Sequence, residues 1–168
     1  MKPKDDIPVA LVKELLRVDD AGNLFWLKDV AKNVKAGSQA GQISSLGYRT
    51  VTIQGKAYKA HRLVWVLAYG VWPEGMLDHI DGDKANNTPA NLRTATAVTN
   101  GQNRKLTKGK TSLAGAYLNK TGWWHSRIRV NKKVIHLGRF RSQEEAHAAY
   151  IAAKREHHTH HVEKNYAI

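Results

Sequence analysis

The stretch that decides the fold reads Asp78-His79-Ile80-Asp81-Gly82-Asp83-Lys84-Ala85-Asn86-Asn87-Thr88-Pro89-Ala90-Asn91-Leu92-Arg93-Thr94-Ala95-Thr96-Ala97-Val98-Thr99-Asn100-Gly101-Gln102-Asn103. It pairs a carboxylate with an adjacent imidazole and follows them with asparagines at fixed offsets. Hydrolysis of a phosphodiester needs a base for the attacking water and a hard cation for the phosphate. Asp78 and Asn100 carry oxygen ligands suited to such a cation, and His79 can serve as the base. The stretch therefore indicates metal-assisted phosphodiester chemistry.

Part of this stretch also has a simpler interpretation. The side chains of Asp81-Gly82-Asp83 and Asn86-Asn87 are typical of turns, because Asp and Asn bond nearby backbone and tolerate left-handed conformations. We interpret both groups as turn residues. The catalytic interpretation is kept for Asp78, His79, Asn91 and Asn100, whose joint spacing turn chemistry does not explain.

The order Asp78-His79, Asn91-Leu92-Arg93, Asn100 and Asn103 resembles the HNH nucleases, in particular the homing endonucleases of phages and introns. The resemblance implies a two-stranded hairpin followed by a helix, wrapped around one divalent metal. It extends over about residues 15–104, because the strand at Gly47-Tyr48 and the helix at His61-Arg62-Leu63 recur in the same branch.

The resemblance also implies a role for each matching residue. Asp78 corresponds to the metal-binding acid, His79 to the general base, and Asn91 to the residue that braces the loop and orients the base. Asn100 occupies a third position, where many members have histidine, and its amide oxygen is a reasonable ligand for Mg²⁺ or Mn²⁺. Asn103 follows at i+3 on the same helix face and is expected to be a second-choice ligand or a phosphate contact.

Two neighbouring residues are weaker candidates. His61 precedes an apolar segment and can approach the metal or a phosphate, although a structural hydrogen-bonding role is the more common one for such a histidine. Arg62 is a candidate phosphate contact on the same grounds.

Composition points to a polyanionic partner. Lys and Arg number 27 against 14 Asp and Glu, and residues 104–168 hold 14 of these cations with only 4 acids. We expect double-stranded DNA rather than a membrane, because no apolar run is long enough to span one and the first residues lack an apolar signal core. We also expect a cytoplasmic location, inside a bacterial host if the gene is phage-borne. The absence of cysteine excludes a thiolate zinc site, so no structural zinc and no small-molecule cofactor are expected.

The first part of the chain predicts a mixture of short helices and hairpins. Apolar residues at helical spacing begin near Val9, and the end of that segment can instead become a strand that turns at 19–23 into Leu24-Phe25-Trp26-Leu27. Residues 28–47 are expected to form a long exposed loop. Strands follow at 48–53 and 56–60, and a buried helix at 61–69 that ends at Gly70.

The last third predicts a small three-stranded antiparallel sheet and one helix. Three period-two stretches lie between Gly115 and Phe140, and Ser142-Gln143-Glu144-Glu145 is a capping box that opens an alanine-rich helix. Alternation places Trp124, Ser126 and Ile128 toward the helix. The opposite face carries Trp123, His125, Arg127 and Arg129.

This segment resembles an AP2 DNA-binding domain over about residues 112–166. The matching marks are Gly115, Trp124, Ile128, Leu137-Gly138-Arg139-Phe140, the helix with Tyr150, and Asn165. The resemblance implies DNA contacts at Tyr117, Asn119, Arg127, Arg129 and His136. The exposed sheet face adds the aromatic Trp123, and the local charge adds Lys132 and Lys133. A sheet-and-helix module that binds protein is the alternative.

These observations predict an α+β protein. An HNH domain with a β-rich scaffold would occupy residues 1–104, a basic linker 105–111, and an AP2-like domain 112–168. The expected function is a homing-type DNA endonuclease that acts as a monomer on DNA and leaves 5′-phosphate and 3′-hydroxyl ends. A non-catalytic DNA-binding regulator on a nuclease scaffold is the rival hypothesis, and an RNA-acting nuclease is not excluded by charge.

Overall fold

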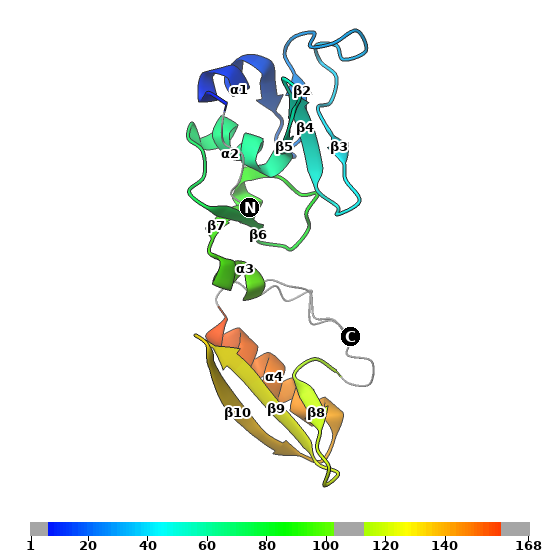
Figure 1. Ribbon diagram of the computed structural model, residues 1–168, viewed down its shortest axis with the longest axis vertical. Helices are drawn as coiled ribbons and strands as arrows, with labels where there is room; N and C mark the ends of the chain where they lie inside the picture. The colour runs from blue at the N-terminus through cyan, green and yellow to red at the C-terminus, as the bar shows by residue number, and fades with distance from the viewer. Residues whose placement is uncertain (1–6, 103–112, 159–168) are drawn as a thin grey trace. The chain divides into compact units, whose positions relative to one another are not determined.

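The computed structural model describes residues 7–102 and 113–158. The chain divides into two compact units, residues 1–97 and 98–168, and each is described by itself (Figure 1). The fold is mixed α+β with several small antiparallel sheets, as the sequence predicts. In the part of the chain that is described, no helix has the length and apolar character needed to cross a membrane. The predicted linker at 105–111 lies outside the described residues.

The first unit begins with a helix that turns directly into a hairpin. Helix α1 covers Val9–Leu15, and the next residue starts strand β1, Leu16–Val18, which pairs with β2, Leu24–Trp26. The prediction that the helical segment ends as a strand is therefore confirmed. Asp19 holds the turn, because its carboxylate accepts hydrogen bonds from the backbone and side-chain N–H groups of Asn23 at 2.7 and 3.1 Å.

A three-stranded sheet and a helix follow. Strands β4 and β5 form the predicted hairpin around Gln54-Gly55, and helix α2 begins at Ala60, one residue earlier than expected. The long loop predicted at 28–47 is mostly exposed, but its end pairs with β4 as a two-residue strand, β3. The bounds are β3 Gln42–Ile43, β4 Arg49–Ile53, β5 Lys56–Lys59 and α2 Ala60–Tyr69.

The core of this unit collects apolar side chains from all of these elements except β3. Val12 of α1, Leu24 of β2, Val51 of β4 and Leu63 of α2 are fully buried within it. Helix α2 is buried along most of its length and ends at Gly70, which adopts the left-handed conformation that favours glycine there. The core thereby fixes the strand that follows α2.

The segment 76–102 has the two-strand and helix order expected for it. Strand β6, Met76–His79, pairs antiparallel with β7, Leu92–Ala95, and helix α3, Ala97–Gln102, follows. A short 3₁₀ turn, Pro89–Asn91, leads into β7. Leu92 joins the main core, so the hairpin is attached to the rest of the unit through an apolar contact.

The second unit is a three-stranded antiparallel sheet covered on one face by a helix (Figure 1). Ser126 and Ile128 of the central strand and Ala146 and Ile151 of the helix are buried. The predicted capping box is present, since Ser142 and Glu145 each bond the other's backbone. The elements are β8 Ala116–Leu118, β9 Trp124–Val130, β10 Lys133–Phe140 and α4 Gln143–His157.

Candidate nuclease site

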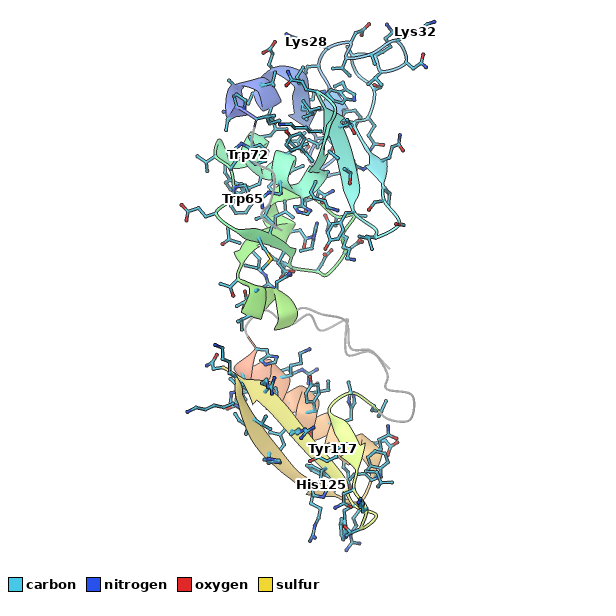
Figure 2. All side chains as sticks on the ribbon, viewed as in Figure 1. Lys28, Lys32, Trp65, Trp72, Tyr117 and His125 are labelled. Carbon is cyan, nitrogen blue, oxygen red and sulfur yellow. The ribbon has the colours of Figure 1, made fainter. Side chains whose placement is uncertain are left out.

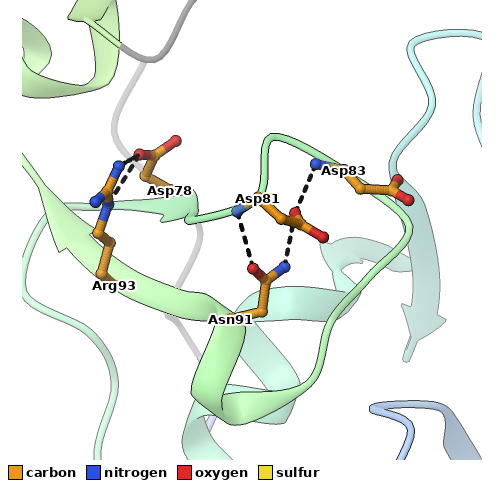
Figure 3. A network of polar contacts seen from close by, with 5 residues as sticks. All are labelled: Asp78, Asp81, Asp83, Asn91 and Arg93. Atoms are coloured by element: carbon orange, nitrogen blue, oxygen red, sulfur yellow. Dashed lines mark hydrogen bonds and ion pairs between the residues drawn. The ribbon is translucent and has the colours of Figure 1, made fainter. Parts of the chain in front are cut away.

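The β6–β7 hairpin places an arginine directly across from the predicted metal-binding acid. Asp78 pairs with Arg93 in the register of the two strands. Arg93 donates from Nη2 and Nε to the Asp78 Oδ2 atom, at 2.9 and 3.2 Å (Figure 3). Asp78 is buried, and a buried carboxylate is stable as an anion only when it is paired and hydrogen-bonded. The arginine therefore pairs with Asp78 and aligns its carboxylate.

Asn91 closes the loop between the two strands. Its Oδ1 atom accepts from the backbone N–H of Asp81, and its Nδ2 atom donates to the Asp81 carboxylate, both at 3.0 Å (Figure 3). The same Nδ2 atom donates to the backbone oxygen of Asn86 at 2.8 Å. The buried Asn91 amide therefore links Asp81 and Asn86, two parts of the same loop, as expected for a residue that braces it.

The loop itself shows the turn chemistry that its composition predicts. The side chains of Asp81, Asp83 and Asn86 each accept a hydrogen bond from the backbone N–H two residues later. Asn87 departs from this interpretation, because it is buried and turned inward rather than serving the turn.

Asn87 contacts the predicted general base. Its Oδ1 atom lies 3.0 Å from Nε2 of His79, and both side chains are buried. The ring of His61 stands edge-on to the ring of His79, with centroids 5.1 Å apart and an interplanar angle of 85°. The imidazole of His79 is thus held at one nitrogen by a hydrogen bond and packs against a second ring.

His61 and Arg62 face the interior of the unit. Burial lowers the pKa of His61 to about 3, and the charges of His79, Arg62 and Lys59 add to the effect. His61 is therefore neutral at physiological pH. Arg62 donates to the backbone oxygens of Gly75 and Pro73 at 2.7 and 3.2 Å, so its guanidinium supports the loop between α2 and β6. This placement does not favour the predicted phosphate contact.

The segment that contains this hairpin matches a known family. Residues 58–102 match the model of the HNH endonuclease family. This segment is an HNH endonuclease domain. HNH endonucleases are phosphodiester hydrolases and generally use a divalent metal.

One solved structure is similar in part. It is described as DNA binding and cleavage by the HNH homing endonuclease I-HmuI, with 27% sequence identity and a TM-score of 0.41. The match covers 57% of this chain and 55% of that one, so the chain spans about half the length of that protein. No curated protein sequence gives a significant match.

The HNH domain contains donors for a hard cation. Among residues 7–102 and 113–158, no group of three or more His, Cys, Asp or Glu side chains surrounds a metal position. A single buried carboxylate nevertheless fits Mg²⁺, which usually takes one or two protein carboxylates together with water and phosphate oxygens. Asn100 lies in α3, half-exposed, and Asn103 lies outside the described residues.

The second unit presents an aromatic and cationic surface on the face of the sheet opposite α4. The Tyr117 and His125 rings stack with centroids 5.6 Å apart, and the guanidinium of Arg127 lies 5.0 Å from the Tyr117 ring centre (Figure 2). Asn119 bonds His125 at 2.9 Å. The other predicted DNA contacts lie beside β9 or on β9 and β10: Trp123, Arg129, Lys132, Lys133 and His136.

Sequence reasoning misses three residues of these two surfaces. The sequence analysis assigns no role to Arg93. Its position opposite Asp78 could have been found by pairing the two predicted strands of the hairpin. Asn87 is a residue type typical of turns, and nothing in the sequence distinguishes it from the neighbouring Asn86. Arg139 stacks on Trp123 at 4.5 Å and pairs with His125 across β9 and β10, so period-two alternation could have identified it.

Proposed function

We propose that this chain is a metal-dependent DNA endonuclease of the homing type. The observation that carries the proposal is the buried Asp78-His79 pair at the end of β6, held by Arg93 and Asn87 inside the segment that matches the HNH family. The metal-binding acid, the base and the bracing asparagine come from one hairpin, and a base together with a bound cation can hydrolyse a phosphodiester.

In the proposed reaction His79 takes a proton from water, and the water attacks the phosphorus in line with the leaving oxygen. With the amide oxygen of Asn87 facing Nε2, that nitrogen carries the proton and the lone pair lies on Nδ1. Nδ1 is then the atom that receives the proton. Asn87 acts as a positioning residue, and Asn91 keeps the loop that carries it closed.

Asp78 and Asn100 would hold the divalent cation, Mg²⁺ or Mn²⁺. The bound cation supplies charge stabilisation at the phosphate and the leaving 3′ oxygen. Arg93 aligns the Asp78 carboxylate by donating two hydrogen bonds to its Oδ2 atom. The products would be 5′-phosphate and 3′-hydroxyl ends.

We further propose that residues 112–168 are an AP2-like DNA-binding domain, preceded by a basic linker at 105–111 and by a nuclease domain at 1–104. A three-stranded sheet with one helix, and a sheet face on which Arg127 and Arg139 stack on aromatic rings, support this. Stacking fixes a guanidinium so that it can reach a phosphate or a guanine edge at lower entropic cost. The expected partner is double-stranded DNA, bound by a monomer.

A plasmid cleavage assay tests the proposal. Wild-type protein with Mg²⁺ should cut supercoiled plasmid, and excess chelator should stop the reaction. His79→Ala should lower the rate by about 10²–10⁴-fold, because a general base contributes about that much, and should leave DNA affinity nearly unchanged. Absence of metal-dependent cutting by the wild type would instead favour a DNA-binding regulator on a nuclease scaffold.

A further inference from the structure

A tyrosine with two lysines lies beside the proposed base, and none of the three belongs to the nuclease motif. Tyr48 precedes β4, Lys59 ends β5, and Lys84 lies in the loop of the HNH hairpin. The two Nζ atoms lie 4.5 and 4.7 Å from the centre of the Tyr48 ring. The two arms of the β4–β5 hairpin and the HNH loop therefore meet at one half-buried ring.

The cluster is adjacent to the proposed catalytic residues. The Tyr48 ring centre lies 6.1 Å from that of His79 and 5.6 Å from that of His61. Burial raises the pKa of Tyr48, and the charge of Asp78 raises it further, so the phenol is within electrostatic reach of that carboxylate. Its hydroxyl therefore stays protonated near neutral pH and can donate a hydrogen bond to an anion.

Both lysines are available to such an anion. Lys84 donates to the backbone oxygen of Leu46 at 2.9 Å, which anchors its ammonium beside the ring. In the part of the chain that the structure describes, neither Lys59 nor Lys84 takes part in a salt bridge. Because both lie near one ring centre, their ammonium groups are less than about 10 Å apart, within the distance over which charges interact at ordinary salt concentration.

Two close cations repel each other, and a bound anion removes that repulsion. We propose that Tyr48, Lys59 and Lys84 form a phosphate-binding site that holds the DNA backbone next to the bond that His79 attacks. The ligand class is a phosphodiester of the cleaved strand. This inference rests on the proposed nuclease function and assigns its strand-positioning contacts to residues outside the motif.

Cation–π packing explains why a tyrosine is suited to this position. The ring attracts both ammonium groups and restricts their long side chains before DNA arrives, which lowers the entropy lost on binding. Its hydroxyl adds a neutral donor. A phosphate held by these groups would lie on the Tyr48 side of His79. The next phosphate along the same strand could then approach His79.

The first experiment removes the charges. Lys59→Ala/Lys84→Ala should lower the single-turnover cleavage rate by on the order of tenfold to a hundredfold, since misplaced substrate loses about that much. The slope of log affinity against log salt should become shallower by about 0.9, because the single phosphate that the two lysines neutralise contributes about 0.9 to it. Lys32→Ala is the matched control, because Lys32 is an exposed lysine in the loop between β2 and β3 of the same unit (Figure 2).

Conservative variants and chemical labelling keep the test independent of misfolding and of cleavage. Lys59→Arg/Lys84→Arg should restore most of the rate and of the salt slope. In wild-type protein without metal, plasmid DNA should protect Lys59 and Lys84 from acylation by an amine-reactive ester, and Lys32 should remain reactive. The proposal is overturned if Lys59 and Lys84 label as fast with DNA as without it, or if the double alanine variant matches Lys32→Ala.

The two proposals can fail separately. A wild-type protein that does not cut plasmid contradicts the nuclease function, whereas the protection of Lys59 and Lys84 still decides whether this cluster binds phosphate. A protein that cuts plasmid but shows no protection contradicts only the phosphate site.

Discussion

The neutral ring of His61 packs against the ring of His79. The burial of His61 makes the free energy of unfolding depend on pH. Its pKa is lowered from 6.5 to about 3, first by burial and then by nearby positive charges. Between these two pH values the unfolded chain binds a proton that the folded chain does not, so stability is lost as pH falls from 6.5 toward 3. Above pH 6.5 the two states bind the same number of protons at this residue.

We therefore expect the free energy of unfolding to depend on pH through His61, and we expect this dependence to be lost when His61 is replaced by a residue that does not titrate. Between pH 6.5 and 5 the wild-type protein should lose about 2 kcal/mol more unfolding free energy than His61→Gln, at about 1.4 kcal/mol per pH unit. Urea unfolding at the two pH values measures this difference. Equal losses in both proteins would show that His61 is protonated in the folded state.

Asn87 fixes the orientation of the His79 ring through the contact between its Oδ1 atom and Nε2. Asn87→Ala should lower kcat by about 10–100-fold with little change in KM, because the His79 ring loses the bond at Nε2 that fixes its tautomer and orientation. Asn87→Asp keeps an acceptor at that position and should retain more activity. The imidazole tautomer, read by ¹⁵N NMR, should shift toward a mixture only in Asn87→Ala; an unchanged tautomer would assign Asn87 to folding alone.

At the scale of elements, the β1–β2 turn supports the HNH loop. Gly22 has a φ of +78°, and a Cβ added there would lie 2.3 Å from the backbone carbon of Asn87. The turn therefore packs against the loop segment that places Asn87 on His79. Only a residue without a side chain permits this approach.

Gly22→Ala should consequently reduce cleavage and stability more than Gly37→Ala. Gly37 has nearly the same φ, +80°, but an added Cβ there meets nothing within 4 Å, so the pair separates backbone strain from the clash. The strain common to both variants should cost about 1 kcal/mol. Cleavage rates and thermal unfolding of the two variants, measured side by side, check this expectation; similar losses would mean that the loop moves aside freely.

At the scale of the whole molecule, charge is divided unequally along the chain. Of the 27 Lys and Arg residues, 12 lie in residues 106–168 together with 4 acids, so this part carries a surplus of +8 of the total of +13. Affinity for DNA depends on salt through the number of phosphates that cations neutralise. Most of the general attraction to DNA should therefore belong to this part.

A protein that ends at residue 105 should bind DNA more weakly, with a shallower salt slope, and should keep residual metal-dependent cutting of lower selectivity.

Arg127→Ala in the full chain separates base reading from phosphate contact: loss of about 1–3 kcal/mol of binding free energy at the preferred site alone indicates a contact with a base edge. Binding titrations across salt concentrations measure both effects. An unchanged slope after the truncation would show that residues 106–168 are not the DNA-binding part.

Much of this organisation is determined by the sequence alone. Period-two alternation in 124–130 correctly predicts the buried positions Ser126 and Ile128, and the Ser142–Glu145 capping box correctly predicts the start of α4. The adjacency of Asp78 and His79, within a spacing shared with a nuclease family, likewise needs no structure to be recognised. These features are local, because strand period, helix caps and neighbouring motif residues depend on a few successive positions.

Only the tertiary structure decided which further side chains meet at the site. Asn87 and Asn86 are indistinguishable in sequence, yet only Asn87 turns inward, because the loop is closed by Asn91 and packed under Gly22. Lys84 approaches Tyr48 because the β4–β5 sheet and the HNH hairpin are fixed against one core. Contacts between distant segments depend on how the chain packs as a whole, and no local pattern of residues encodes them.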